Sequence, residues 1–427
     1  MDQAHAGPHP SPEAGEGQEL NFPGPLARRL VMAAFAGIRE GHLRLHTPEG
    51  RVAFGDPGSP LKAEAEVRDP RAWTAGAFQG EVGLGEAYMQ GWWSSPDPVA
   101  VVRLAVRNME AFDRAGGLLS ALGKLANRLR HLGRRNDEAG SRANIAHHYD
   151  LGNAFYRLWL DESLAYSCAF WRDPSESLAQ AQVNKFEMIC EKLRLGPGDH
   201  LLEIGTGWGG FAAHAARTRG CRVTTTTISK EQHDHAAALF RREGLDGLIN
   251  LRLQDYRRLE GTYTKAVSIE MFEAVGLRYY DTFFGAVDRL LVPGGSFLMQ
   301  AITMNERRFP DYIRGTDWIQ KHIFPGAELA SVGEVLQSLA RTGSLRLHHL
   351  EDIGLHYART LRAWRHAFLH RLDDIRALGF DETFLRMWDY YLAYCEGAFL
   401  ERHIGDAQLL LVKPGAGPLA NETGLAL

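Results

Sequence analysis

Residues 201–210 combine an apolar run, an acid and a glycine-rich turn. Glu203 closes the apolar run, and Gly205 and Gly207 follow it within four residues. Glycine adopts backbone angles that are closed to residues carrying a Cβ, so this turn lets the main chain approach a ligand closely. The run after Gly210 predicts a helix whose first turn presents free N–H groups and partial positive charge. These features predict a site for a nucleoside-like cofactor.

The position of the acid distinguishes two classes of cofactor. Gly205, Gly207 and Gly210 also fit the dinucleotide fingerprint, which expects an acid about 20 residues further on to hold the ribose. Residues 221–229 contain no acid, and Glu203 instead precedes the glycines. That order is typical of enzymes that use S-adenosylmethionine (SAM). SAM is therefore favoured over two alternatives, a dinucleotide and a loop that only packs glycines between a strand and a helix.

Strands and helices alternate around this loop. Apolar and β-branched runs predict seven strands, at 200–204, 222–227, 249–253, 265–269, 295–302, 345–351 and 407–413. Helices are expected between most of them, which predicts a parallel α/β sheet with the ligand at the carboxyl ends of the strands. The stretch 305–341 interrupts the alternation, and we expect it to form a helical cap over the site.

The residues before 143 follow a different pattern. Alternation on both sides of the turn at 48–50 predicts a hairpin, and an apolar helix is expected from 98 to about 112. We therefore expect a small α+β domain at 21–117. Residues 118–142 predict a basic amphipathic helix, either a linker with a solvated face or a surface that meets anionic phospholipid. The compositions of 1–20 and 414–427 predict disordered tails.

Composition excludes several classes of function. The formal net charge of −4 provides no basic field for nucleic acid. The four cysteines show no C-x-x-C spacing, which favours neither a zinc site nor a disulfide framework and is typical of the reducing cytoplasm. No apolar run approaches the roughly 20 residues that span a bilayer, and the N-terminal region lacks the apolar core of a signal peptide. Any membrane contact should therefore be peripheral.

Ordered sequence blocks identify a resemblance over about residues 35–413. The blocks are 83–93, 147–153, 166–171, 227–232, 254–257, 268–276, 318–325 and 357–364, together with the glycine loop. They resemble the cyclopropane-fatty-acid synthase family of SAM-dependent methyltransferases. The resemblance implies a class I methyltransferase fold at 143–413, Rossmann-like with a mostly parallel seven-stranded sheet, and a lipid-docking domain at 21–117.

The same resemblance implies the reaction. A methyl(ene) group would pass from SAM to the cis double bond of an unsaturated acyl chain in a membrane phospholipid, giving a cyclopropane at the inner leaflet. A homodimer is implied by the resemblance alone. Two rivals are a catalytically silent lipid-binding protein, which predicts no SAM turnover, and a soluble small-molecule methyltransferase, which predicts activity without vesicles.

This chemistry places requirements on the site. An isolated alkene is a poor nucleophile, so the sulfonium methyl must be held against it in a dry cavity. Attack leaves a carbocation, which aromatic faces stabilise and water would quench. Ring closure then requires a base to remove a proton from the added methyl. The motif blocks offer aromatic candidates: Tyr149, Tyr166, Phe170, Trp171, Phe272, Tyr357 and Trp364.

By resemblance, the base is a bound bicarbonate ion. Its holders here would be Cys168, Glu273, Tyr357 and the backbone amide of Ile302. Gln300 and Ala274 stand where many members have histidine. A glutamine amide can donate a hydrogen bond to bicarbonate but cannot relay a proton as imidazole does. The alternative product is therefore a methyl or methylene branch, formed by C-methylation without ring closure.

The residues around the glycine loop are expected to hold SAM. Glu203, Gly205 and Gly207 would line its methionine and ribose portion, and the resemblance suggests that neighbouring side chains close over it. The full expected set is Tyr166, Ser167, Glu203, Gly205, Gly207, Thr227, Ile228, Gln232, Asp255 and Tyr256. Within that set, Thr227 and Gln232 would take the ribose role of the missing acid. Asp255 and Tyr256 would flank the adenine.

Overall fold

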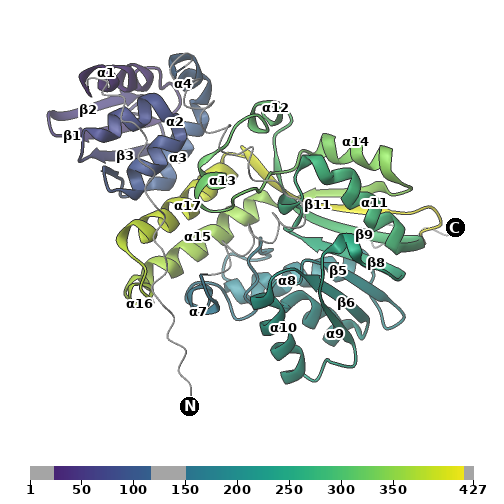
Figure 1. Cartoon of the computed structure of the whole chain (residues 1–427). Helices are drawn as coiled ribbons and strands as arrows, with labels where there is room; N and C mark the ends of the chain where they lie inside the picture. The colour runs from purple at the N-terminus through teal and green to yellow at the C-terminus, as the bar shows by residue number, and fades with distance from the viewer. Residues whose placement is uncertain (1–23, 117–150, 418–427) are drawn as a thin grey trace.

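A computed structural model describes residues 24–116 and 151–417, which form two sheets and the helices around them (Figure 1). The expected tail 1–20, the expected linker helix 118–142 and most of the expected tail 414–427 lie outside the described residues, as does Tyr149. The boundaries 21–117 and 143–413 stay predictions. No helix in the described ranges is both long and apolar enough to cross a membrane.

The smaller sheet has the strand order β2-β1-β3-β4. Its strands are β1 (His42–Thr47), β2 (Gly50–Gly55), β3 (Lys62–Val67) and β4 (Trp93–Ser94). The expected hairpin is β1 and β2, which pair antiparallel, and β3 adds to β1 in parallel. Four helices accompany this sheet: α1 (Gly24–Phe35), α2 (Arg71–Met89), α3 (Pro98–Arg107) and α4 (Met109–Gly116).

The larger sheet contains the seven predicted strands in the order β10-β11-β9-β8-β5-β6-β7. They are β5 (His200–Ile204), β6 (Arg222–Thr227), β7 (Ile249–Leu253), β8 (Tyr263–Ile269), β9 (Leu291–Met304), β10 (Arg346–Asp352) and β11 (Ile404–Val412). Strands β5 to β9 pair in parallel, whereas β11 pairs antiparallel with both β9 and β10. The mostly parallel seven-stranded fold is thus confirmed.

Helices cover both faces of this sheet because successive strand residues point to opposite sides. Leu201 packs into a core with Phe186 and Phe211, whereas Leu202 packs into a separate core with Phe283. The helices that supply these cores are α8 (Leu178–Leu193), α9 (Gly210–Arg219), α10 (Lys230–Arg242), α11 (Tyr280–Leu290) and α14 (Val332–Thr342). Shorter elements are α7 (Asn153–Tyr156), α12 (Phe309–Tyr312), α13 (Trp318–His322), η1 (Tyr256–Arg258), η2 (Phe272–Ala274) and η3 (Leu277–Tyr279).

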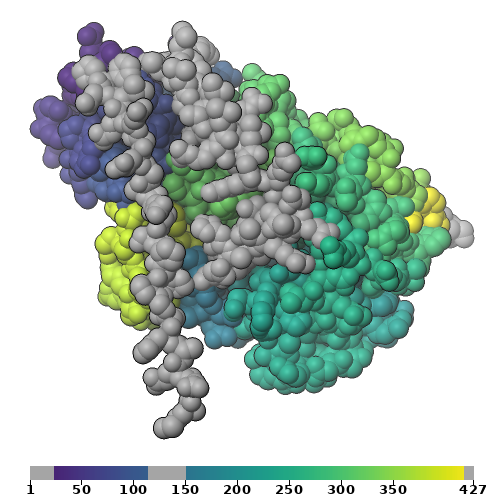
Figure 2. All heavy atoms as spheres, in the orientation of Figure 1, coloured from purple at the N-terminus to yellow at the C-terminus, as the bar shows by residue number. Residues whose placement is uncertain are grey.

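Three helices between β10 and β11 join the two sheets. They are α15 (Gly354–His370), α16 (Leu372–Ala377) and α17 (Glu382–Leu400). One hydrophobic core contains Trp73 of α2, Trp364 of α15 and Trp388 of α17, so the small part shares its core with the inserted helices. Figure 2 shows the purple and blue atoms of the small part resting against the yellow-green atoms of these helices.

Candidate active site

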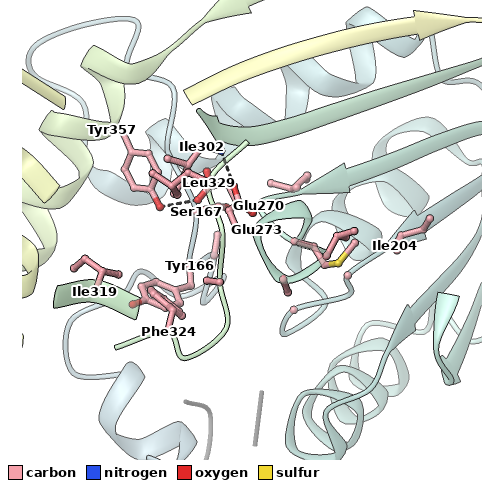
Figure 3. A pocket seen from close by; sticks show the side chains of 18 of the residues that line it. Tyr166, Ser167, Ile204, Glu270, Glu273, Ile302, Ile319, Phe324, Leu329 and Tyr357 are labelled. Carbon is pink, nitrogen blue, oxygen red and sulfur yellow. Dashed lines mark hydrogen bonds between the residues drawn. The ribbon is translucent and has the colours of Figure 1, made fainter. Parts of the chain in front are cut away.

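A cavity of about 340 Å³ lies at the carboxyl ends of β5, β6 and β8. All ten residues expected to hold SAM line it, and so do Glu273, Ile302 and Tyr357. Cys168 and Gln300 are fully buried and do not line it. Ile319 and Phe324, from the stretch expected to cap the site, close one side (Figure 3).

The glycine loop has the backbone that its sequence predicts. Gly205 and Gly207 have φ values of 103° and 53°, in the region that L side chains rarely adopt. A Cβ on Gly205 would also lie 3.0 Å from Met271 Cβ. Gly209, with φ 93°, then starts α9. The loop therefore brings bare backbone to the cavity directly below a helix N-terminus.

Glu203 supplies a buried carboxyl group beside this loop. The residue is 2% exposed and accepts a hydrogen bond from the Thr225 hydroxyl. Burial raises the pKa of Glu203 to about 8, although that hydrogen bond and the charge of Lys185 act in the opposite direction. A carboxyl group that lacks bulk water is well placed to accept hydrogen bonds from ligand hydroxyl or ammonium groups. The loop and this acid fit the ribose and amino-acid portion of SAM.

The next strand end carries the expected polar pair. The Thr227 hydroxyl donates to Gln232 Oε1 over 2.9 Å, and both side chains are buried at the cavity wall. Asp255 is also buried, but Arg257 binds both of its carboxylate oxygens. Tyr256 packs edge-on against Phe283, with ring centroids 5.3 Å apart. The Asp255 carboxylate at the cavity wall is therefore already paired with a guanidinium group.

Glu270, which sequence reasoning did not select, organises the other end of the cavity. It directly follows β8 and has a φ of 46°, an unfavourable region for a residue that is not glycine. Its Oε1 accepts hydrogen bonds from the Cys168 backbone N–H and from Gln300 Nε2, each over 2.7 Å. Its Oε2 accepts a 2.6 Å hydrogen bond from the Tyr357 hydroxyl, which points toward it in Figure 3. The available signal was an acid at the carboxyl end of a parallel strand.

Glu273 lies beside Glu270 in η2. Its Oε1 accepts a hydrogen bond from the Ile302 backbone N–H, as its place in the sequence block suggests. Its Oε2 is buried and makes no hydrogen bond with the described residues. Burial, followed by the nearby charge of Glu270, raises the pKa of Glu273 to about 8. Glu273 is therefore mainly protonated near neutral pH.

Two predicted side chains act differently from the expectation. The Cys168 thiol faces the carbonyl oxygens of Ala169 and Ile353, so only its backbone N–H reaches Glu270. Gln300 binds Glu270 and Asp406 through Nε2, and its Oε1 accepts from Gln408 Nε2. Both ends of the Gln300 amide are thereby engaged within the protein.

The expected aromatic residues divide into lining and supporting groups. Tyr166 and Tyr357 line the cavity together with Phe324 and Phe399. Trp364 lies behind both tyrosines, with ring centroids 5.3 Å from Tyr166 and 6.0 Å from Tyr357. The remaining three described candidates point elsewhere. Phe170 stacks on His356, Trp171 binds the Thr360 hydroxyl, and Phe272 belongs to the core under α11.

Lys185 is a further residue that sequence reasoning missed. It lines the cavity yet is fully buried, and its ammonium group donates to the Ser167 hydroxyl over 2.6 Å. Burial lowers its pKa, while the charge of Glu270 acts in the opposite direction. No cluster of metal-ligating side chains occurs in the described part of the chain.

Known proteins with similar sequences belong to one family of lipid-modifying methyltransferases and cyclopropane synthases. The family model for mycolic acid cyclopropane synthetase matches residues 136–409. The chain is 39% identical to the cyclopropane-fatty-acyl-phospholipid synthase of Escherichia coli K12 over 346 residues, 80% of this chain and 86% of that protein. It is 36% identical to tuberculostearic acid methyltransferase UfaA1 of Mycobacterium tuberculosis over 343 residues, 79% of this chain and 80% of that protein.

Solved structures of cyclopropane synthases have a similar fold. The cyclopropane synthase MmaA2 from Mycobacterium tuberculosis superposes with a TM-score of 0.60 at 29% identity, covering 64% of this chain and 98% of that one. The mycolic acid cyclopropane synthase CmaA1, complexed with SAH and CTAB, has the same identity and coverage and a TM-score of 0.59.

Proposed function

Because this chain belongs to the mycolic acid cyclopropane synthetase family and is a SAM-dependent methyltransferase of lipid acyl chains, we propose that it acts on membrane phospholipids. Its substrate would be the cis double bond of an unsaturated acyl chain, and its product a cyclopropane. The protein would reach that chain as a peripheral membrane enzyme on the cytoplasmic side.

One observation carries this proposal. A single cavity connects the glycine loop and Glu203 at one end to Tyr357, Glu270 and Glu273 at the other. Ile319 and Phe324 add apolar side chains to its wall beside Tyr166 (Figure 3). A methyl donor and an apolar acceptor can therefore share one cavity, with acidic groups at the acceptor end.

The side chains of this cavity suit a cationic reaction. SAM, when bound, supplies the electrophilic methyl group. The apolar walls exclude water, which would otherwise capture the carbocation. The faces of Tyr166, Phe324 and Tyr357 offer negative ring quadrupoles to a positive carbon. The carboxyl groups of Glu270 and Glu273 lie in the same cavity, where a proton must leave.

Bicarbonate fits this end of the cavity poorly. Of its four expected contacts, the Tyr357 hydroxyl binds Glu270 and the Ile302 N–H binds Glu273. Cys168 presents only its backbone N–H, which also binds Glu270. The bicarbonate assignment stays a prediction.

The alternative product is a methyl or methylene branch. Gln300 replaces the histidine expected by resemblance, and one relative is named as a tuberculostearic acid methyltransferase. In this alternative the same methyl transfer occurs, but the cation is resolved by a hydride shift and loss of a proton without ring closure. The first steps and the cavity requirements are shared by both products.

The deciding experiment follows deuterium from SAM carrying a CD₃ group into vesicles of monounsaturated phospholipid. A cyclopropane retains two deuteriums and resists ozonolysis, whereas a methylene branch retains two and is cleaved by it. A methyl branch formed by a hydride shift and loss of a proton from the chain retains all three and is also cleaved by ozone. We expect a doubly deuterated, ozone-resistant chain by mass spectrometry. Label only in added soluble acceptors, with none in lipid, would contradict the phospholipid proposal.

A further inference from the structure

The backbone of Glu270 has an energetically unfavourable conformation. Its φ of 46° lies in the left-handed region, which residues with a Cβ adopt rarely. The backbone is fixed there by a 2.8 Å hydrogen bond from the Glu270 N–H to the Gln300 carbonyl oxygen. The result is a carboxyl group placed at the cavity wall, at the carboxyl end of a central strand.

The hydrogen-bond donors that could bind an anion in this region bind the Glu270 carboxylate instead. Three independent groups converge on it: the Cys168 N–H, the Gln300 amide and the Tyr357 hydroxyl. Each lies 2.6 to 2.7 Å from a Glu270 oxygen, within the range of charge-assisted hydrogen bonds. Gln408 fixes the Gln300 amide so that its NH₂ faces Glu270.

The surroundings oppose a second anion at this place. Glu273 and Asp406 also lie here, and burial, followed by the charge of Glu270, raises the pKa of both carboxyl groups. An added ion would need donors that already bind Glu270, and it would lie beside the Glu270 carboxylate.

We propose that Glu270 is the base of the reaction and that it takes the place of a bound bicarbonate ion. This inference rests on the proposed methylation of an alkene. It concerns only which group removes the proton once the methyl has been added.

The step balances as follows. After methyl transfer, an oxygen of Glu270 takes one proton from the added methyl carbon. The electron pair of that C–H bond forms the last C–C bond of the ring and neutralises the carbocation. Glu270 becomes a carboxylic acid, and it returns its proton to water after the product leaves.

Glu270 suits this role better than its neighbours. Three donors stabilise its ionised form, whereas Glu273 accepts one hydrogen bond from Ile302 and holds a proton near pH 7. Asp406 does not line the cavity, and burial raises its pKa as well. Burial raises the pKa of Glu270 as well, but its three hydrogen bonds and the nearby Lys185 ammonium act in the opposite direction and favour the ionised form.

The test compares Glu270→Gly and Glu270→Gln with the full-length wild-type protein, in buffers stripped of carbon dioxide and in buffers with millimolar bicarbonate. Wild-type turnover of CD₃-labelled SAM on lipid vesicles should be equal in both. Each variant should lose about 100-fold or more, as expected for removal of a general base. Bicarbonate should restore activity only to Glu270→Gly, where removal of the side chain opens a space. Glycine also suits the observed φ, so this variant should fold.

A matched control and a second readout keep the result clear. Glu396 is a buried carboxyl group on α17 that pairs with Arg362 outside the cavity, so Glu396→Gln should leave turnover and its bicarbonate response unchanged. Calorimetric binding of SAH should be preserved in every variant. Carbon-13 NMR with labelled bicarbonate should detect binding to Glu270→Gly but not to wild type.

Several outcomes would overturn the proposal. They are a wild-type rate that requires bicarbonate, near wild-type activity in Glu270→Gln, or saturable binding of labelled bicarbonate to wild type. The NMR result does not depend on turnover. If wild type modified no lipid, the proposed function would fail while the assignment of this site could still be judged.

Discussion

At the scale of single residues, the cavity is defined by acids that are kept from water. Glu203 and Glu273 both have pKa values raised to about 8, in each case mainly by burial. Their ordinary value is 4.5, so between those two pH values the folded state holds protons that the unfolded state releases. Their contribution to stability is therefore complete below about pH 4.5 and is lost as the pH rises through about 8.

This difference predicts a pH-dependent effect of Glu203→Gln on the cofactor-free protein. The amide cannot ionise, so the variant escapes a penalty of up to about 1.4 kcal/mol per pH unit that wild type meets in this window. The Tm of the variant relative to wild type should increase from pH 5 to about pH 8 and then level off. Thermal unfolding followed by circular dichroism measures it, and parallel Tm curves would contradict the burial of this acid.

The sequence was more informative about which residues gather here than about what each one does. The blocks around Cys168, Glu273 and Tyr357 predicted a shared site, and the fold brings these residues together. Cys168 was expected to hold a bicarbonate ion, whereas its backbone N–H binds Glu270. Glu270 was missed because only the three-dimensional arrangement reveals that donors from three separate segments converge on it.

At the scale of elements, periodicity decided what could be predicted. The larger sheet was predictable because its strands are rich in Val, Ile, Leu and Thr, as in β6 with its four threonines. Strand β3 was missed because its sequence, Lys-Ala-Glu-Ala-Glu-Val, contains residues that are uncommon in strands. Its pairing with β1 and the burial of its alanines determine the structure instead.

The packing of α2 against α13 gives a second prediction. Gly85 is buried in α2, and a Cβ there would overlap the Trp318 indole and approach Tyr390 Cε1 to 2.8 Å. Gly85→Ala should therefore cost about 1–3 kcal/mol through overpacking. Gly285→Ala is the matched control, since that helical position is open and alanine should stabilise α11 by about 0.5–1 kcal/mol. Urea unfolding measures both, and equal effects would contradict this contact.

At the scale of the whole molecule, polar contacts lock the small part onto the inserted helices. Tyr88 donates to Asp389, which also binds Arg365. Arg386 donates to the backbone carbonyl oxygens of Tyr88 and Trp93. Helices α15 and α17 also supply Tyr357 and Phe399 to the cavity. The small part therefore supports the reaction site through these two helices.

The basic composition of 118–142 predicts how the protein meets its substrate. We expect the full chain to co-sediment with vesicles containing anionic phospholipid, and we expect added salt to weaken the binding by screening. Lipid methylation should decrease in parallel with binding as salt increases, while SAH affinity stays constant. Activity on a soluble acceptor without any vesicle binding would favour a small-molecule methyltransferase instead.

The placement of Glu270 also affects how the reaction depends on its environment. A proton acceptor that belongs to the polypeptide is present once in every folded molecule. A dissolved ion would have to be recruited, and its occupancy would follow gas exchange and the hydration of carbon dioxide. With Glu270 as base, membrane lipid modification would proceed equally at low and high carbon dioxide tension. Its rate would then depend on the supply of methyl donor and of unsaturated chains.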